Sequence, residues 1–247
     1  MKKSKKISFI TNGILLIVVV SVLSISLIPQ NAVQMNGGTT VQAIYNGNRA
    51  NPNVSLMFNV YENTKVVEGI AQELDKRGLK ATFFVGGCWA DDNGEMLNKL
   101  VASGHEIANH GYFHKDHKKL SYEQNKEEIR LTGAIVKALC GQTLNLFAPP
   151  SGSFSDDTLS AASNLGYKVI MWSKDTIDWR DKDVSLIVKR ATQKTTNGDL
   201  ILMHPKEHTL KALPTILDYF EKIGLKQVKV SQNISQSQTL GENNDVQ

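Results

Sequence analysis

The chain has 247 residues, of which 41% are hydrophobic and 21% charged, a composition typical of globular proteins rather than disordered ones. Its formal charge of +4 comes from one end, because residues 1–52 hold five basic and no acidic residues, leaving 23 basic against 24 acidic residues beyond. Such a balance excludes nucleic acid as a partner, since it provides no basic surface. Two cysteines exclude a disulfide framework but leave open a single Cys88–Cys140 bridge.

The N-terminal residues have the pattern of a membrane-targeting segment. Four lysines precede an apolar stretch, residues 7–28, which as a helix of ~1.5 Å rise per residue spans most of a ~30 Å hydrocarbon core. We expect residues 1–28 to be an uncleaved signal anchor in the cell membrane, making a single-pass protein with an extracellular domain. The alternative is a cleaved signal and a secreted domain, with a mature start near Val33 or Ile44.

Beyond the anchor, the chain divides by composition into three parts. Residues 29–53 are rich in Asn, Gly, Gln and Thr and are expected to be a linker, whereas residues 232–247 lack periodicity and are expected to be a disordered tail. Between them, in residues 54–231, short apolar runs alternate with segments of helical periodicity. The central part is therefore predicted to be one folded domain.

The alternation within this domain predicts an α/β fold. Predicted strands cover residues 54–58, 80–86, 105–109, 144–148, 167–172, 199–204 and 226–231. Predicted helices cover residues 64–78, 121–141, 156–166 and 210–224, with Ser121 as an N-cap and Gly141 just beyond a helix C-terminus. Strands separated by helices favour a mostly parallel sheet, and about seven such units fit a distorted, incomplete (β/α) barrel.

Polar residues follow most of the predicted strands. In chain order these are Asn59 after the first strand, His110 and His114 after the third, Pro149 after the fourth, Asp175, Asp178 and Trp179 after the fifth, and His204 after the sixth. Because parallel strands end at one rim, we expect these side chains to converge there. Two histidines four residues apart suit zinc, although two hydrogen-bonded loop histidines would show the same spacing. A histidine beside a carboxylate suits a general acid.

The order of several short motifs is more specific than any single residue. The stretches MFNVYE, KATFFVGG, GHEIANHGYFH, FAPPSG, DTIDW and LMHP resemble, in this order, those of the polysaccharide deacetylase family, carbohydrate esterase family four. The resemblance covers about residues 54–231 and is strongest to bacterial members that act on the cell wall or in sporulation. It implies a distorted (β/α) barrel and a metal-dependent hydrolase of non-peptide carbon–nitrogen bonds, which removes N-acetyl groups from amino sugars of peptidoglycan or a related glycan.

The resemblance assigns roles to particular residues. His110 and His114 match the family's metal-binding histidines, which implies a divalent metal, zinc in the first instance. His204 matches the general acid, and Asp178 and Trp179 match the fourth motif. Pro149 and Leu202 match substrate-binding positions, and the motif residue whose backbone N–H stabilises the oxyanion falls on Ser151, where a backbone donor survives the change of side chain.

Three of the departures from the family pattern fall on residues with a chemical role. The first motif, Thr-Phe-Asp-Asp-Gly-Pro, aligns with residues 57–62, so that the catalytic base falls on Asn59 and a metal-binding aspartate falls on Val60. The arginine of the third motif, which holds the base, falls on Ala148; an arginine without that charged partner would bear an uncompensated desolvation cost. The sequence therefore leaves two hypotheses, a wall deacetylase of weak or altered activity and a catalytically impaired glycan-binding pseudoenzyme that acts in wall or spore assembly.

Overall fold

The computed structural model describes residues 41–235. The predicted signal anchor, most of the predicted linker up to residue 40, and the tail from residue 236 lie outside the described residues. Within residues 41–235, no helix is both long enough and apolar enough to cross a membrane.

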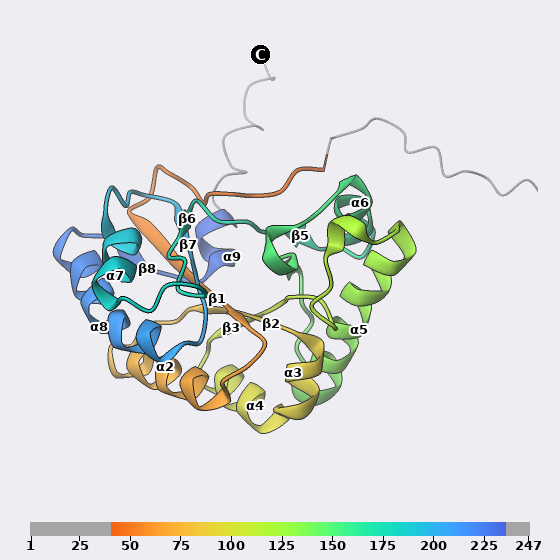
Figure 1. The fold of residues 1–247 in the computed structure, drawn as a ribbon, viewed down its shortest axis with the longest axis horizontal. Coiled ribbons are helices and arrows are strands. Elements are labelled where there is room, and N and C mark those ends of the chain that lie inside the picture. Colours follow the sequence, from red (N-terminus) through yellow and green to blue (C-terminus); the bar gives the residue numbers. More distant parts are fainter. Residues whose placement is uncertain (1–40, 236–247) are drawn as a thin grey trace, which may run out of the picture. The chain divides into compact units, whose positions relative to one another are not determined.

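The central element is a curved sheet in which all paired strands run parallel (Figure 1). Its strands are β1 (Asn53–Val60), β2 (Thr82–Val85), β3 (Glu106–Asn109), β4 (Leu146–Phe147), β5 (Lys168–Val169), β6 (Lys174–Asp175), β7 (Asp199–Met203) and β8 (Lys226–Gln227). They follow the order β5-β4-β3-β2-β1-β7-β6, and β8 pairs with the beginning of β1. The sheet does not close between β5 and β6, which confirms the predicted incomplete barrel of about seven parallel strands.

Helices cover the outer side of this sheet, with α8, α2, α4, α3 and α5 following one another around it in Figure 1. The α-helices are α2 (Thr64–Lys76), α3 (Gly87–Asp92), α4 (Gly94–Ala102), α5 (Tyr122–Cys140), α6 (Asp156–Asn164), α7 (Val184–Thr192), α8 (Glu207–Lys222) and α9 (Val230–Ile234); two short 3-10 turns are η1 (His117–Lys119) and η2 (Pro150–Gly152). All four predicted helices are present. Both predicted ends of α5 are also confirmed, because Ser121 makes a capping box with Gln124 and Gly141 has a left-handed φ of 72°.

Successive side chains of the central strand β1 point alternately into two apolar clusters, one on each face of the sheet. Val54, Leu56, Phe58 and Val60 belong to the larger cluster, which also contains apolar side chains of α2 and α8 and so lies between the sheet and its helices. Met57 belongs to the smaller cluster, which contains side chains of β2, β3, β4 and α9. Because successive side chains of a strand point to opposite faces, Asn59 lies on the same face as Met57.

At its beginning, the folded part starts earlier than the predicted boundary at residue 54. Ile44 forms a parallel bridge with Ile170, and Asn46 forms an antiparallel bridge with Asp199. The backbone of Ile44 donates to Val169 at 2.8 Å and accepts from Met171 at 2.8 Å. This segment extends the sheet through backbone hydrogen bonds, which its polar composition did not reveal.

At the other end, the first residues of the predicted tail are helical. Helix α9 reaches Ile234, and Asn233 is fully buried, with its side chain donating to the hydroxyl of Ser55 at 3.0 Å. The disulfide that the sequence left open does not form, because Cys88 and Cys140 are both free thiols.

Candidate active site

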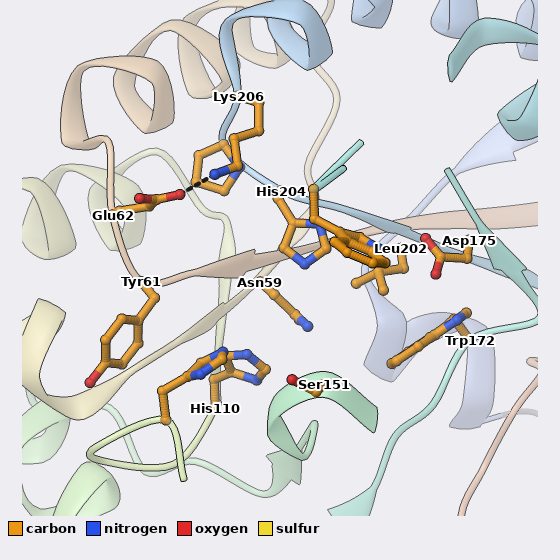
Figure 2. Close-up of a pocket in the computed structure, with 13 residues that line it drawn as sticks. Asn59, Tyr61, Glu62, His110, Ser151, Trp172, Asp175, Leu202, His204 and Lys206 are labelled. Atoms are coloured by element: carbon orange, nitrogen blue, oxygen red, sulfur yellow. Dashed lines mark hydrogen bonds and ion pairs between the residues drawn. The ribbon is translucent and has the colours of Figure 1, made fainter. Parts of the chain in front are cut away.

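A pocket of about 590 Å³ opens where β1, β3 and β7 end, as the barrel prediction requires (Figure 2). It is lined by Asn59, Tyr61, Glu62, His110, His114, Ser151, Trp172, Asp175, Trp179, Leu202, His204, Pro205 and Lys206. Eight of the ten residues that the sequence analysis places at the rim or in substrate-binding positions are therefore brought together from positions between 59 and 204 in the chain. Of the other two, Asp178 lies behind the pocket wall, fully buried, and Pro149 precedes the turn η2 without lining the pocket.

His204 and Asp178 form a hydrogen-bonded pair. The Nδ1–H of His204 donates to Oδ1 of Asp178 at 2.7 Å, and the backbone N–H of His204 donates to Oδ2 at 2.7 Å. These two contacts fix both the ring and the backbone of the histidine, and the proton on Nδ1 leaves Nε2 available to the pocket. This is the geometry that the resemblance implies for a general acid and the carboxylate that orients it.

Asp178 also holds the beginning of α8. Its Oδ2 accepts from the hydroxyl of Thr209 at 2.6 Å, and its backbone carbonyl accepts from Nε2 of His208 at 2.7 Å. A fully buried carboxylate with three donors has its charge compensated by hydrogen bonds. The fold therefore needs Asp178 whether or not His204 performs chemistry.

His110 is a neutral imidazole. Its Nδ1–H donates to the carbonyl of Ala148 at 2.7 Å, which leaves Nε2 without a proton. Burial, reinforced by the neighbouring His114, lowers the pKa of His110 to about 3. The ring of His114 lies 5.2 Å from that of His110 between centroids, and burial also lowers the pKa of His114. Both rings are thus uncharged groups at neutral pH.

Asn59 occupies the predicted position of the base. It is 5% exposed, and its Oδ1 is buried with no hydrogen-bond partner. In Figure 2 its side chain points into the same space as those of His110 and His204. A carboxamide accepts hydrogen bonds but does not take up a proton near neutral pH, so the residue that faces the reacting position cannot act as a base.

Val60 does not face the pocket at all. Strand β1 continues through it, pairing Val60 with Val85, and the N–H of Gly86 donates to its carbonyl at 2.9 Å. The side chain is fully buried in the cluster between the sheet and the helices. The backbone therefore directs this position away from His110 and His114.

A metal centre does not fit the side chains of this pocket. Members of the family are generally metal-dependent, and His110 and His114 are the two residues that the sequence predicts as ligands. Within the described part of the chain, no group of three or more His, Cys, Asp and Glu side chains could hold an ion. Two imidazoles and a carboxamide are fewer strong ligands than a protein zinc site uses.

The turn η2 forms the part of the wall beside His110 (Figure 2). Ser151 lies in a left-handed conformation with φ of 56°, followed by Gly152 with φ of 64°, and Gly152 donates to the carbonyl of Pro149 at 3.0 Å. Ser151 contributes to the pocket, as predicted, and its role in binding an oxyanion stays a prediction. A non-glycine residue in this conformation is uncommon and marks a turn whose shape matters.

Several lining residues were not among the predicted site residues. Tyr61, Trp172 and Lys206 follow β1, β5 and β7, at the rim where such residues were sought. Lys206 forms an ion pair with Glu62 on one side of the pocket (Figure 2). Beside it, the side chain of Asn63 donates to the carbonyl of Pro205 at 3.1 Å. Tyr61 and Lys206 come shortly after predicted strands, which is the sequence signal that could have found them, whereas Trp172 lies at the end of the predicted strand 167–172.

The fold and the pocket together define a class: an α/β half-barrel protein with a hydrolase-like site at the strand ends. Residues 46–170, half of the chain, match the family model described as polysaccharide deacetylase. The chain belongs to the polysaccharide deacetylase family, which confirms the family resemblance seen in the sequence.

The family includes enzymes and a pseudoenzyme among the proteins similar to this chain. YlxY of Bacillus subtilis (strain 168), an uncharacterised protein, is 34% identical over 183 residues, which cover 74% of this chain and 57% of YlxY. The peptidoglycan-N-acetylglucosamine deacetylase PgdA of Listeria monocytogenes is 26% identical over 194 residues, covering 78% of this chain and 41% of PgdA. The chain therefore spans less than two thirds of either relative.

The solved structure of BA3943, a CE4 family pseudoenzyme from Bacillus anthracis, superposes with a TM-score of 0.76 at 31% identity. The match covers 78% of this chain and 69% of BA3943. A mutant of BA3943 with restored enzymatic activity also superposes with a TM-score of 0.76.

Proposed function

We propose that this domain binds N-acetylated amino-sugar polysaccharide of the cell wall, peptidoglycan in the first instance, and that its hydrolytic centre is impaired. The observation that supports this proposal most directly is the carboxamide of Asn59, buried with an unpartnered oxygen, at the place of the family's base. The absence of a base removes ~10²–10⁴ in rate from a reaction that depends on one.

The pocket is suited to a neutral sugar ring with an acetamido group. Trp172 and Trp179 provide aromatic surface, and Trp179 is 53% exposed and accessible for stacking. In Figure 2 the amide nitrogen of Asn59 points into the pocket, where it can donate a hydrogen bond to the acetamido carbonyl of a ligand. His110 is neutral at the same wall, and its unprotonated Nε2 can accept a hydrogen bond from a ligand.

A second candidate function is slow deacetylation, and the intact Asp178–His204 pair favours it. In this reading His204 protonates the leaving amine through Nε2, and Asp178 holds the ring in position. The zinc that the sequence predicts at His110 and His114 lacks a third strong ligand among the described residues of this pocket, so this candidate rests on His204 and Asp178. The structural role of Asp178 weakens this candidate, because the pair would persist without any selection for catalysis.

One sample of the purified chain tests both candidates. Binding of N-acetylglucosamine tetramer and of purified glycan strands is measured by calorimetry, and acetate release is measured on the same ligands with and without added zinc. We expect binding without acetate release above that of the His204→Ala variant, together with weaker binding by Trp179→Ala. Zinc-dependent release lost in His204→Ala would establish the slow enzyme, and no binding to any glycan would refute the proposal.

We also propose that the domain works on the outer side of the cell membrane, anchored by residues 1–28, in wall or spore assembly. The support is the lysine-flanked apolar stretch, residues 7–28, and the wall-directed members of the family. Mass spectrometry of the native N-terminus tests the anchor. A mature chain that starts near Val33 or Ile44 would replace the anchored protein by a secreted one.

A further inference from the structure

The register of β1 places an aromatic ring where the pocket meets the histidines. Asn59 and Tyr61 both line the pocket, whereas Val60 between them is buried on the opposite face. This is the two-residue period of an extended chain. The family's first motif has glycine at the position of Tyr61 and aspartate at the position of Asn59. On the pocket face of β1, this chain therefore has an aromatic side chain where the motif has none, and a carboxamide where the motif has a carboxylate.

The ring of Tyr61 packs on His114. Their centroids are 4.9 Å apart with an interplanar angle of 54°, and the Tyr61 hydroxyl donates to the carbonyl of Tyr112 at 3.3 Å. Tyr61 thus contacts the histidine loop, residues 110–114, through both its ring and its hydroxyl. In Figure 2 it lies beside His110, on the side away from Ser151.

The surroundings of Tyr61 accommodate this ring closely. A Cβ added to Gly86 would lie 2.2 Å from Cδ2 of Tyr61, closer than any real contact. Gly86 has φ of −71° and ψ of 142°, a conformation open to any residue, so the ring of Tyr61 is what requires glycine there. On the open side, the Glu62–Lys206 ion pair and the Asn63–Pro205 hydrogen bond tie the residues after Tyr61 to the loop that follows β7.

We infer that Tyr61 substitutes for the metal centre: its ring occupies the approach to His114 and holds the histidine loop, so that the pocket binds its ligand without a metal ion. A ligand to an ion near His114 has to come from the same side as the ring, because Val60 faces the helices. The ring is a non-ligating group in that place, and it replaces by packing the rigidity that coordination would give to the loop. The part of this inference that concerns the glycan rests on the proposed function; the part that concerns the metal does not.

The metal arm of the test compares Tyr61→Gly with the wild-type chain and with Tyr61→Phe, which keeps the ring and loses the hydroxyl. Zinc affinity is measured by calorimetry, and cobalt absorption reports the coordination. We expect Tyr61→Gly to bind zinc at least tenfold more tightly than wild type, an effect in the range seen when residues around a metal site are changed. We expect the zinc affinity of Tyr61→Phe to match that of wild type within about twofold. The gain must disappear in Tyr61→Gly/His114→Ala if it arises at this histidine.

The register adds a sharper comparison. In the Tyr61→Gly background, Asn59→Asp supplies a carboxylate on the pocket face and should raise zinc affinity further, about tenfold or more. Val60→Asp in the same background should give no gain, because its carboxylate faces the apolar cluster. Circular dichroism checks each fold, and a Val60→Asp variant that fails to fold does not affect the comparison of Asn59→Asp with Tyr61→Gly.

The glycan arm measures N-acetylglucosamine tetramer binding with a chelator and with zinc. We expect the wild-type affinity to agree within twofold between the two conditions, and Tyr61→Gly to bind three- to tenfold more weakly. Micromolar zinc binding by wild type, equal zinc affinity of wild type and Tyr61→Gly, or a gain that survives His114→Ala would each overturn the inference. If wild type binds no glycan while the metal arm behaves as expected, the proposed function fails and the role of Tyr61 stands.

Discussion

Replacing Asp178 separates its structural role from any catalytic one. The carboxylate of Asp178 is fully buried and accepts from the backbone N–H of His204 and the hydroxyl of Thr209, and both donors lose their acceptor in Asp178→Ala. Each donor left without an acceptor costs ~1–3 kcal/mol, and with the cavity we expect the free energy of unfolding to fall by about 3–5 kcal/mol. A domain of this size loses ~2–4 °C of Tm per kcal/mol, so the Tm should fall by about 10 °C.

Two further variants make this prediction quantitative. Asp178→Asn keeps one oxygen for the His204 N–H and the Thr209 hydroxyl, so we expect a loss of only ~1 kcal/mol, with the proton of the His204 ring moved from Nδ1 to Nε2. Thr209→Val removes one donor and its hydrogen bond and should cost ~1 kcal/mol. Urea unfolding gives the free energies, and nitrogen chemical shifts give the tautomer. The reasoning is refuted if Asp178→Ala is no less stable than Thr209→Val.

Three other predictions concern the surroundings of the pocket. Glu128, 3% exposed, accepts two backbone N–H groups of the histidine loop at 3.0 and 2.7 Å, so Glu128→Ala should lose ~3 kcal/mol in urea unfolding and Glu128→Gln about half as much; equal losses would contradict this. Gly86→Ala should cost ~1–3 kcal/mol in the wild type and nearly nothing in a Tyr61→Ala background, and equal costs in the two would show that the ring is not the obstacle. Burial lowers the pKa of His105 from 6.5 to about 4, so as the pH falls the unfolded chain takes up a proton on this residue before the folded chain does. The free energy of unfolding should therefore fall by on the order of 2 kcal/mol between pH 6.5 and pH 5. Urea unfolding at both pH values measures this fall, which should be smaller in His105→Asn.

The fold was predictable where local chemistry and global packing agree. Helix α5 begins and ends where its cap residues indicate, and the apolar runs that form β1, β2 and β7 are fully or nearly fully buried. Strand β6 has two residues and the helices α3 and α9 have six and five, too short to show periodicity. The segment before β1 was missed for a different reason, because its contacts with the sheet are backbone hydrogen bonds that any sequence can make.

The candidate site was predictable to the extent that it lies at strand ends. The parallel sheet brings His110 and His114, which follow β3, and His204, which follows β7, to one pocket, as the rule of the C-terminal rim anticipates. The Glu62–Lys206 pair could not be found in the same way, since it joins two loops whose relative height above the barrel depends on packing. The unpartnered oxygen of Asn59 is likewise a property of three-dimensional surroundings and not of residue type.

The direction of Val60 changes how the loss of the two carboxylates is understood. Two consecutive residues can both serve a pocket at the end of a strand only if the extended conformation ends between them, because extended neighbours face opposite sides. In this chain β1 stays paired through Val60, which is buried among apolar side chains, and the next residue on the pocket face is Tyr61. An aspartate at position 60 would therefore be a buried, unpaired charge in this backbone, and valine is the residue that the register favours. The substitutions at positions 59 to 61 thus act as one rebuilt strand end, and a variant that restores only the two carboxylates would have to move the ring of Tyr61 before it could form a metal site.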